Sequence, residues 1–370
     1  MSAPANPPIP PLRSTLADLP GFRPPPTEAD VAPGRSMRRL HLNEGAFPPS
    51  PVAIAAIREA AGQVHRYPDP RCRTLAAAVA ARTGVAVERL VFGNGSEELL
   101  SMLVGMTLQA GSHAVLPVPS FPRYLAGAKL AGAAVAAVPV RLDGANDIPA
   151  MLVAVTPGTR LIVVATPNNP TGAMLDAVDI ERLAREAPAH ALLMVDEAYY
   201  EFGRHAGGPD VLAILQGSKA PWVVLRTFSK AYGLAGVRVG YAICGDAGMA
   251  EAINRVRGVF NVDSLAQAAA LAALGDEAHV RNLLDDCQRQ RQRLSAGFAA
   301  AGCPTLPSVA NFIAAWMPMP AAEAVKAFAA AGILVGALGV APFENHIRVT
   351  IGTGDDTDAV LAALPQIVRR

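Results

Sequence analysis

Lys230 is the side chain best placed to do chemistry in this sequence, and it lies within residues 226–241, which read RTFSKAYGLAGVRVGY. The apolar run at 222–225 precedes it and predicts a buried strand, so Lys230 would lie just beyond the end of that strand. Ser229 stands immediately before the lysine, and Arg238 follows eight residues after it. An amine, a hydroxyl and a guanidinium in this arrangement suit a ligand with an electrophilic carbonyl for the amine and a phosphate for the other two groups.

Pyridoxal phosphate has both of these groups, and its enzymes bind it through a lysine. Taken alone, a Ser-Lys pair more often belongs to a surface turn, so further residues must decide. Such a site needs a carboxylate beside the pyridine nitrogen, and Asp196, after the apolar run 191–195, is the candidate, with helix capping as its alternative. Asn169 and Tyr199 follow neighbouring predicted strands and could donate to the phenolate oxygen of the cofactor. Phe121 could stack on the ring or belong to the core.

A second candidate anion site lies at residues 93–100, GNGSEELL, which follow a short predicted strand at 90–92. A glycine-rich turn that opens onto a helix exposes N–H groups at the positive end of the helix dipole. The backbone N–H groups of Ser96 and Glu97, with the Ser96 hydroxyl, could therefore bind a phosphate. Ordinary helix capping by Ser96 explains the same residues equally well.

Apolar strands alternate with helices along most of the chain, which predicts a parallel sheet covered on both faces. We expect an α/β fold, a three-layer sandwich with a mostly parallel central sheet, plus a small α/β domain. In such sheets ligands bind outside the carboxyl ends of the strands, where each polar cluster named above is expected. The predicted strands are 90–92, 114–118, 134–140, 161–165, 191–195 and 222–225, and the predicted helices between them include 51–61, 74–83 and 179–186.

The chain divides into four predicted parts. Residues 1–36 are rich in proline and predict a flexible N-terminal arm without helix or sheet. Residues 37–50, with a short strand at 40–44, would associate with the small domain; residues 51–270 would form the large, cofactor-binding domain and residues 271–370 the small domain. The last part is predicted to contain helix 277–301, strand 312–316, helix 321–331, strands 333–335 and 346–351, and helix 357–368.

The composition excludes several classes of function. Lys and Arg total 32 against 31 Asp and Glu, which gives no electrostatic case for binding nucleic acid or an anionic membrane. The four cysteines lie far apart without a metal-binding spacing, so we expect no metal site and reduced thiols in a cytoplasmic protein. No apolar run approaches the ~20 residues of a membrane span, and the N-terminus does not resemble a secretion signal.

Six stretches together resemble the fold-type I, pyridoxal-phosphate-dependent aminotransferases, and in particular the histidinol-phosphate aminotransferase group. Each stretch alone is weak, but their shared order and spacing over about residues 40 to 355 are specific. They are RYPD at 66–69, GNGSEELL at 93–100, TPNNPTG at 166–172, DEAY at 196–199 with EF at 201–202, residues 227–241, and IRVTIG at 347–352.

The resemblance implies a role for each candidate residue. Lys230 would carry the cofactor covalently and, once displaced by the substrate amine, transfer the proton at the substrate α-carbon. Asp196 would pair with the pyridinium, and Arg348 would bind the substrate α-carboxylate as a bidentate fork. The remaining roles would be the phenolate oxygen for Asn169 and Tyr199, the cofactor phosphate for Ser96, Glu97, Ser229 and Arg238 with Tyr67 from a second subunit, and the substrate pocket for Asn43.

The implied enzyme is a homodimer that moves an amino group between an amino acid, or an amino-alcohol phosphate such as histidinol phosphate, and a 2-oxo acid such as 2-oxoglutarate. Three departures from the group concern the substrate phosphate. The usual Asn-Glu-Asn-Pro loop is replaced at 43–49, Gly336 stands where an arginine is common, and Phe22 is the aromatic residue nearest to the usual arm tyrosine. We therefore expect histidinol phosphate to be accepted without greatly outperforming aromatic or other apolar amino acids.

Three alternatives share the same cofactor site. One is a decarboxylase of the threonine-phosphate type, which differs only in which substrate bond breaks. Another is a non-catalytic sensor domain that binds pyridoxal phosphate, although no helix-turn-helix precedes residue 37 here. The third is a catalytically inactive homologue, although Lys230 and Asp196 are both present.

Overall fold

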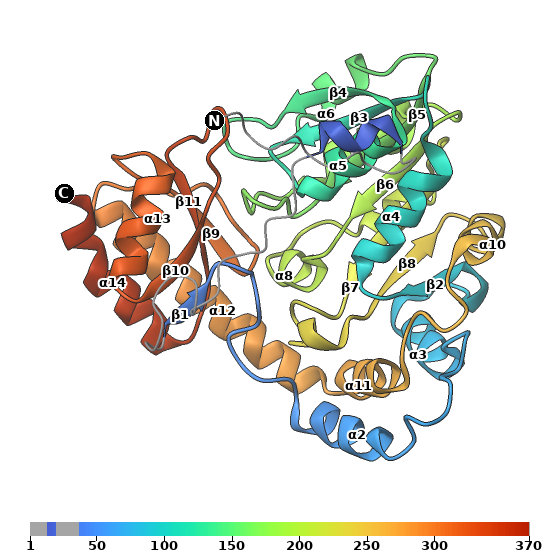
Figure 1. The fold of residues 1–370 in the computed structure, drawn as a ribbon, viewed down its shortest axis with the longest axis horizontal. Coiled ribbons are helices and arrows are strands. Elements are labelled where there is room, and N and C mark those ends of the chain that lie inside the picture. The colour runs from blue at the N-terminus through green and yellow to red at the C-terminus, as the bar shows by residue number, and fades with distance from the viewer. Residues whose placement is uncertain (1–12, 20–36, 370) are drawn as a thin grey trace, which may run out of the picture.

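The computed structural model describes residues 13–19 and 37–369, which contain two β-sheets (Figure 1). The larger sheet has seven strands in the order β2-β8-β7-β6-β5-β3-β4. Within this sheet β8 runs antiparallel to both of its neighbours, and the other pairings are parallel. The strands are β2 (Leu90–Gly93), β3 (His113–Val118), β4 (Ala134–Pro139), β5 (Thr159–Ala165), β6 (Leu192–Asp196), β7 (Trp222–Thr227) and β8 (Gly240–Cys244).

Helices cover both faces of this sheet because its central strands are apolar on both sides. Val195 and Val224 pack into one core together with α3 (Arg73–Thr83), α7 (Ala177–Glu186) and α11 (Ser264–Gly275). Met194 and Leu225, one residue away on the same strands, pack into a second core with α4 (Ser96–Thr107), α5 (Pro122–Ala131) and α10 (Ala247–Val256). These two cores on opposite faces produce three layers, and the predicted α/β fold class is confirmed.

The helix boundaries follow the expected start and stop signals. Ser50 caps α2 and accepts a hydrogen bond from the Ala53 N–H, with Pro51 in the first turn, and Gly84 ends α3 in the left-handed conformation at φ 70°. The α-helices are α2 (Pro51–Ala61), α3 (Arg73–Thr83), α4 (Ser96–Thr107), α5 (Pro122–Ala131), α6 (Ile148–Val153), α7 (Ala177–Glu186), α8 (Tyr200–His205), α9 (Val211–Leu215), α10 (Ala247–Val256), α11 (Ser264–Gly275), α12 (Glu277–Ala300), α13 (Ala321–Ala330) and α14 (Gly354–Val368). Short 3-10 helices occur at η1 (Ser14–Asp18), η2 (Val87–Arg89) and η3 (Ala235–Val237).

The smaller sheet has the order β1-β10-β11-β9, with β1 at Arg38–Leu40, β9 at Phe312–Trp316, β10 at Ile333–Ala337 and β11 at His346–Thr350. β1 pairs in parallel with β10, so a segment from the start of the chain lies among the C-terminal strands (Figure 1). The predicted strand at 40–44 is wrong, because the strand ends at Leu40. Asn43 has a left-handed backbone (φ 55°), and its N–H binds the Thr350 hydroxyl instead of a strand neighbour.

One part of the N-terminal arm differs from the prediction. We expected no helix within residues 1–36, but Ser14–Asp18 forms a 3-10 turn that packs on α5, where the Thr15 hydroxyl donates to the Leu130 carbonyl at 3.0 Å. The reason is local, since STLAD is a proline-free interval between Pro11 and Pro20. The rest of the arm, including Phe22, lies outside the described residues.

Candidate active site

A pocket of about 680 Å³ lies at the carboxyl ends of β5, β6 and β7 and extends to the smaller sheet. It brings together every predicted site residue except Tyr67: Asn43, Ser96, Glu97, Phe121, Asn169, Asp196, Tyr199, Ser229, Lys230, Arg238 and Arg348 all line it. Tyr67 is 80% exposed and stacks on Phe260 with ring centroids 4.4 Å apart.

Lys230 follows β7 and places its amine inside this pocket. Its Nζ donates to the backbone carbonyl of Asn43 at 2.9 Å and to that of Leu42 at 3.4 Å. Burial lowers the pKa of Lys230 to about 8, and the nearby Arg348 guanidinium contributes in the same direction. An amine with this pKa is partly neutral, and therefore nucleophilic, near pH 8.

Asp196 ends β6 and is buried at 7% exposure. One carboxylate oxygen accepts a hydrogen bond from the Tyr124 hydroxyl at 2.5 Å, and the other accepts the Ala198 N–H at 2.9 Å. Burial raises the pKa of Asp196, while the bond from Tyr124 acts in the opposite direction. The capping alternative fails, because α8 has Tyr199 at its N-cap and no side-chain cap.

Tyr124 was missed by the sequence analysis. It lies in α5, three residues after Phe121, and the two rings make an edge contact with centroids 5.8 Å apart. Burial, followed by the Asp196 carboxylate, raises the pKa of Tyr124 well above its ordinary value, so it remains a hydrogen-bond donor. The helical spacing of two aromatic residues after a strand end was the available signal.

Residues of the smaller sheet complete the pocket. Arg348, on β11, donates from Nη1 to the Asn169 side-chain oxygen at 2.6 Å and from Nη2 to the His41 carbonyl at 2.7 Å. Its Nε is buried and has no hydrogen-bond partner among the residues that the structure describes. The Asn43 amide donates to the Tyr199 hydroxyl at 2.9 Å, and burial raises the pKa of Tyr199 to about 12.

A candidate anion-binding site lies at the start of α4. Gly95, at φ 75°, leads into Ser96, and Arg238 faces this turn from a left-handed backbone at φ 54°. A Cβ on Gly95 would lie 2.5 Å from Arg238 Nη2, and a Cβ on Gly240 would lie 2.5 Å from the Ser96 nitrogen. Two glycines thus let the helix N-terminus and a guanidinium approach the same point. Arg238 also donates to the Ser229 hydroxyl at 3.4 Å.

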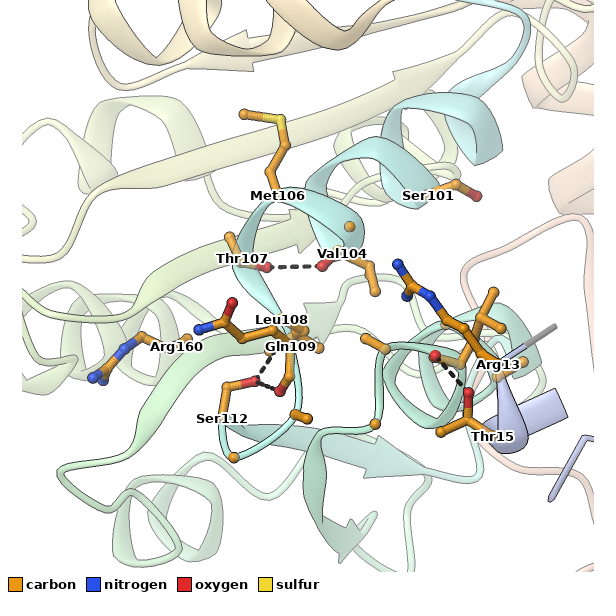
Figure 2. Close-up of a pocket in the computed structure, with 18 of the residues that line it drawn as sticks. Arg13, Thr15, Ser101, Val104, Met106, Thr107, Leu108, Gln109, Ser112 and Arg160 are labelled. Carbon is orange, nitrogen blue, oxygen red and sulfur yellow. Dashed lines mark hydrogen bonds between the residues drawn. The ribbon is translucent and has the colours of Figure 1, made fainter. Parts of the chain in front are cut away.

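A larger hollow of about 1040 Å³ lies elsewhere, between α4, α5 and the 3-10 turn of the arm (Figure 2). Its described lining includes Arg13, Arg123 and Arg160 but no lysine, histidine, cysteine or carboxylate. Figure 2 shows Arg13, Ser101 and Arg160 around this hollow, on different structural elements. It offers neither a covalent anchor for a carbonyl ligand nor an acid and base pair, so the pocket around Lys230 is the candidate for chemistry.

Comparison with known proteins identifies the family. The model of aminotransferase class I and II matches residues 37–364. The chain belongs to this family. It is 36% identical over 330 residues to histidinol-phosphate aminotransferase of Moorella thermoacetica, covering 89% of this chain and 85% of that protein. It is 40% identical over 368 residues to aromatic amino acid aminotransferase of Nocardia farcinica, covering 97% of this chain and 98% of that protein.

A solved structure supports the same assignment. Histidinol-phosphate aminotransferase from Sinorhizobium meliloti, in complex with pyridoxal-5′-phosphate, superposes with a TM-score of 0.90 at 30% identity and 98% coverage of both chains. Membership of the aminotransferase family confirms the predicted resemblance, the transaminase activity and the cofactor, pyridoxal 5′-phosphate. In the described part of the chain, every helix of this aminotransferase is too short or too polar to cross a membrane.

Proposed function

We propose that the pocket around Lys230 is the active site and that its residues act in the predicted roles. The observation that carries this proposal is the convergence in one pocket of a partly buried lysine of lowered pKa, a buried carboxylate and a candidate anion-binding site. The donors of this pocket fit the cofactor. Ser96, Ser229 and Arg238 suit its phosphate, and Lys230 suits its aldehyde.

When bound, pyridoxal phosphate supplies an electron sink for the substrate α-carbon. Asp196 would hold a proton on the ring nitrogen, since its buried carboxylate lacks a cationic side chain in hydrogen-bonding contact among the described residues. Asn169 and Tyr199 would donate to the ring oxygen, and Phe121 would cover the ring. The Lys230 amine would bind the carbonyl carbon and then, when free, take the proton from the substrate α-carbon.

Arg348 is the proposed site for the substrate α-carboxylate. Its two terminal nitrogens currently bind neutral acceptors, the Asn169 amide oxygen and the His41 carbonyl, while its Nε is unused among the described residues. A carboxylate would replace neutral acceptors by a charged one, and such bonds are roughly twice as strong. Gly336 lies opposite Arg348 in the strand register, and a Cβ there would lie 3.6 Å from Nη2.

The substrate side chain is proposed to be aromatic or apolar. The pocket's described lining contains three cations, Lys230, Arg238 and Arg348, and each already has a role. None of the described arginines that could have replaced the missing phosphate contacts lines the pocket, and each has a carboxylate partner: Arg38 pairs with Asp356, Arg39 with Glu44 and Arg123 with Glu97. Arg23 lies outside the described residues. The lining residues without an assigned role include the apolar Leu338 and Val340. The aromatic specificity of the Nocardia farcinica relative is consistent with this.

We also propose a cytoplasmic homodimer in which Tyr67 serves the partner's pocket. Tyr67 is exposed and lies outside the lining of its own pocket, and its stacked partner Phe260 is 42% exposed. Exposed, stacked aromatic side chains are typical of the central part of a subunit interface. The four cysteines are free and buried, which suits a reducing compartment.

The test combines labelling with kinetics. Borohydride reduction of the cofactor-loaded protein should fix the added mass on the peptide that contains Lys230, and a label elsewhere would refute the anchor. With 2-oxoglutarate as acceptor, kcat/KM should be measured for phenylalanine, tyrosine, leucine and histidinol phosphate. A preference for the phosphate ester above about a thousandfold, roughly 4 kcal/mol, would refute the proposed side-chain pocket. Release of CO₂ would identify a decarboxylase, and binding without turnover would identify a sensor.

A further inference from the structure

A buried ion pair lies beneath the pocket and has no part in the proposed chemistry. Arg226, on β7, places Nε 2.8 Å and Nη2 2.7 Å from the same carboxylate oxygen of Glu197. Arg226 is 1% exposed and Glu197 3% exposed, and neither lines the pocket. The Arg226 guanidinium also lies against the ring of Tyr200, 3.4 Å from its centroid.

The cluster of Glu197, Arg226 and Tyr200 occupies the opposite face of the sheet from Asp196. Side chains alternate along a strand, and Asp196 contacts Tyr124 of α5, which packs on the face covered by α4, α5 and α10. Glu197 and Arg226 follow Asp196 and Leu225 by one residue each, so they point to the other face. The pair therefore acts on the pocket through the backbone rather than by direct contact.

Each member of the cluster is a close neighbour in sequence of a proposed active-site residue. Glu197 directly follows Asp196, Tyr200 directly follows Tyr199, and Arg226 precedes Lys230 by four residues. The Glu197 N–H donates to the Leu225 carbonyl at 2.8 Å, immediately beyond the last register pair of β6 and β7. The ion pair thus joins the segment that leaves β6 after Asp196 to the end of β7, from which the chain continues to Lys230.

The stability of the fold does not explain this pair well. A buried ion pair costs desolvation, and apolar residues of similar volume are often as stabilising or more so. Burial alone would lower the pKa of Arg226, but the Glu197 carboxylate raises it, so the guanidinium stays charged. What the pair adds is a fixed orientation of the guanidinium, because the planar group is held by the hydrogen bond from Nε, the close ion-pair contact at Nη2 and the ring of Tyr200.

We propose that Glu197, Arg226 and Tyr200 form a positioning cluster that fixes the strand ends bearing Asp196 and Lys230. The inference rests on the proposed roles of those two residues. Small displacements of a reacting group can lower a rate by about a hundredfold, so the cluster controls kcat although it contacts neither cofactor nor substrate.

Two variants separate positioning from folding. Arg226→Lys keeps the charge but loses the Nε hydrogen bond to Glu197 and the planar group that lies over the Tyr200 ring. The double variant Glu197→Met, Arg226→Met removes both charges and keeps the volume, and it should unfold at a temperature close to that of the wild type. The matched control is Arg141→Met, Asp179→Met, which removes a partly buried ion pair of 2.9 Å whose members do not line the pocket.

Both cluster variants are expected to lower kcat by about tenfold to a hundredfold and to change KM less. They should also raise the Kd for pyridoxal phosphate and shift the pH at which the absorbance of the bound cofactor titrates. A merely structural role would not move that titration midpoint. The control should leave kcat, KM and Kd within about twofold of the wild-type values and should not shift the midpoint. Wild-type values for Arg226→Lys would overturn the proposal, even if the double variant fails to fold. Lys230→Ala and Asp196→Asn serve as references, since their retained activity would instead refute the proposed function.

Discussion

Replacing Lys230 by methionine is expected to stabilise the cofactor-free protein near neutral pH. Burial, with the Arg348 and Arg238 guanidinium groups contributing, lowers the pKa of Lys230 from 10.5 to about 8. At 1.36 kcal/mol for each pKa unit, holding the charged amine in the folded protein costs about 3 kcal/mol relative to the neutral amine. Methionine has a similar length and carries no charge, so the variant avoids this cost.

Part of this gain in stability is offset because the variant loses the hydrogen bonds of the Lys230 amine. The amine donates to the Asn43 and Leu42 carbonyls, and methionine would leave these acceptors without that donor. Each lost bond costs about 1 kcal/mol, which leaves a net gain of about 1 kcal/mol at pH 7. The cost of the lost hydrogen bonds does not depend on pH over the range tested, whereas the cost of holding the charged amine in the folded protein does. Measurements at two pH values therefore separate the two contributions.

The sign of the pH dependence follows from the two pKa values. The unfolded chain keeps its proton up to about pH 10.5, while the folded protein releases it near pH 8, so the unfolded state binds more protons between these values. Between pH 8 and 10.5 this group therefore makes the wild type more stable as the pH rises. The advantage of Lys230→Met should shrink over that interval and reverse at about pH 9, where the cost of the charged amine has fallen to the ~2 kcal/mol of the lost hydrogen bonds.

The assay is urea unfolding of the cofactor-free proteins at about pH 7 and pH 10.5. Two tryptophans report on the two sheets, Trp222 on β7 and Trp316 on β9. The exposed Lys219 supplies the control variant, Lys219→Met, which should differ from the wild type equally at both pH values. A stability difference between Lys230→Met and the wild type that does not change with pH would refute the reasoning.

Four further predictions concern the pocket. Asp196→Asn should keep cofactor binding but lower kcat by more than about a hundredfold, because its charge acts along the reaction path; an unchanged kcat would refute the role. Tyr124→Phe removes the bond that lowers the pKa of Asp196, so the acid limb of the kcat profile should move to higher pH. Tyr67→Phe should speed cofactor loss on dialysis, and a fully active monomer in sedimentation would contradict the shared site. Arg348→Lys should lower kcat/KM for all amino acids alike, by a factor equivalent to about 1.5–3 kcal/mol of transition-state stabilisation. A loss confined to one substrate would contradict its role.

The residues of the pocket could be predicted from the sequence because the side chains that suit the chemistry also stand where the predicted strands end. Asn169, Asp196 and Lys230 each follow an apolar run, and carboxyl ends of parallel strands share one edge of a sheet. The strand order did not need to be known, since β5, β6 and β7 proved to be adjacent and in parallel register. The helix ends at Ser50 and Gly84 could also be predicted, because helix capping depends on only a few neighbouring residues.

Contacts between distant segments could not be predicted in this way. Tyr124 meets Asp196 across 72 positions in the sequence, and Asn43 meets Tyr199 across 156. Local patterns do not report such pairs, since the first depends on how α5 packs on the larger sheet and the second on how the two sheets approach each other. The strand expected at 40–44 failed for a related reason: the backbone at Asn43 is bound by Thr350 from β11, a contact that overrides local strand preference.

The pocket is a joint product of both sheets, and this explains why its groups need one another. Lys230 and Tyr199 from the larger sheet bind the carbonyl and the amide of Asn43, whose segment continues from β1 of the smaller sheet. Arg348 of the smaller sheet binds Asn169 of the larger one. Each bond therefore joins a residue proposed to contact the cofactor to one proposed to contact the substrate. A change in the position of the smaller sheet would move the Arg348 guanidinium relative to the Lys230 amine. The contacts that hold the two sheets together therefore also set the distance between the group proposed to bind the substrate carboxylate and the group proposed to transfer the proton.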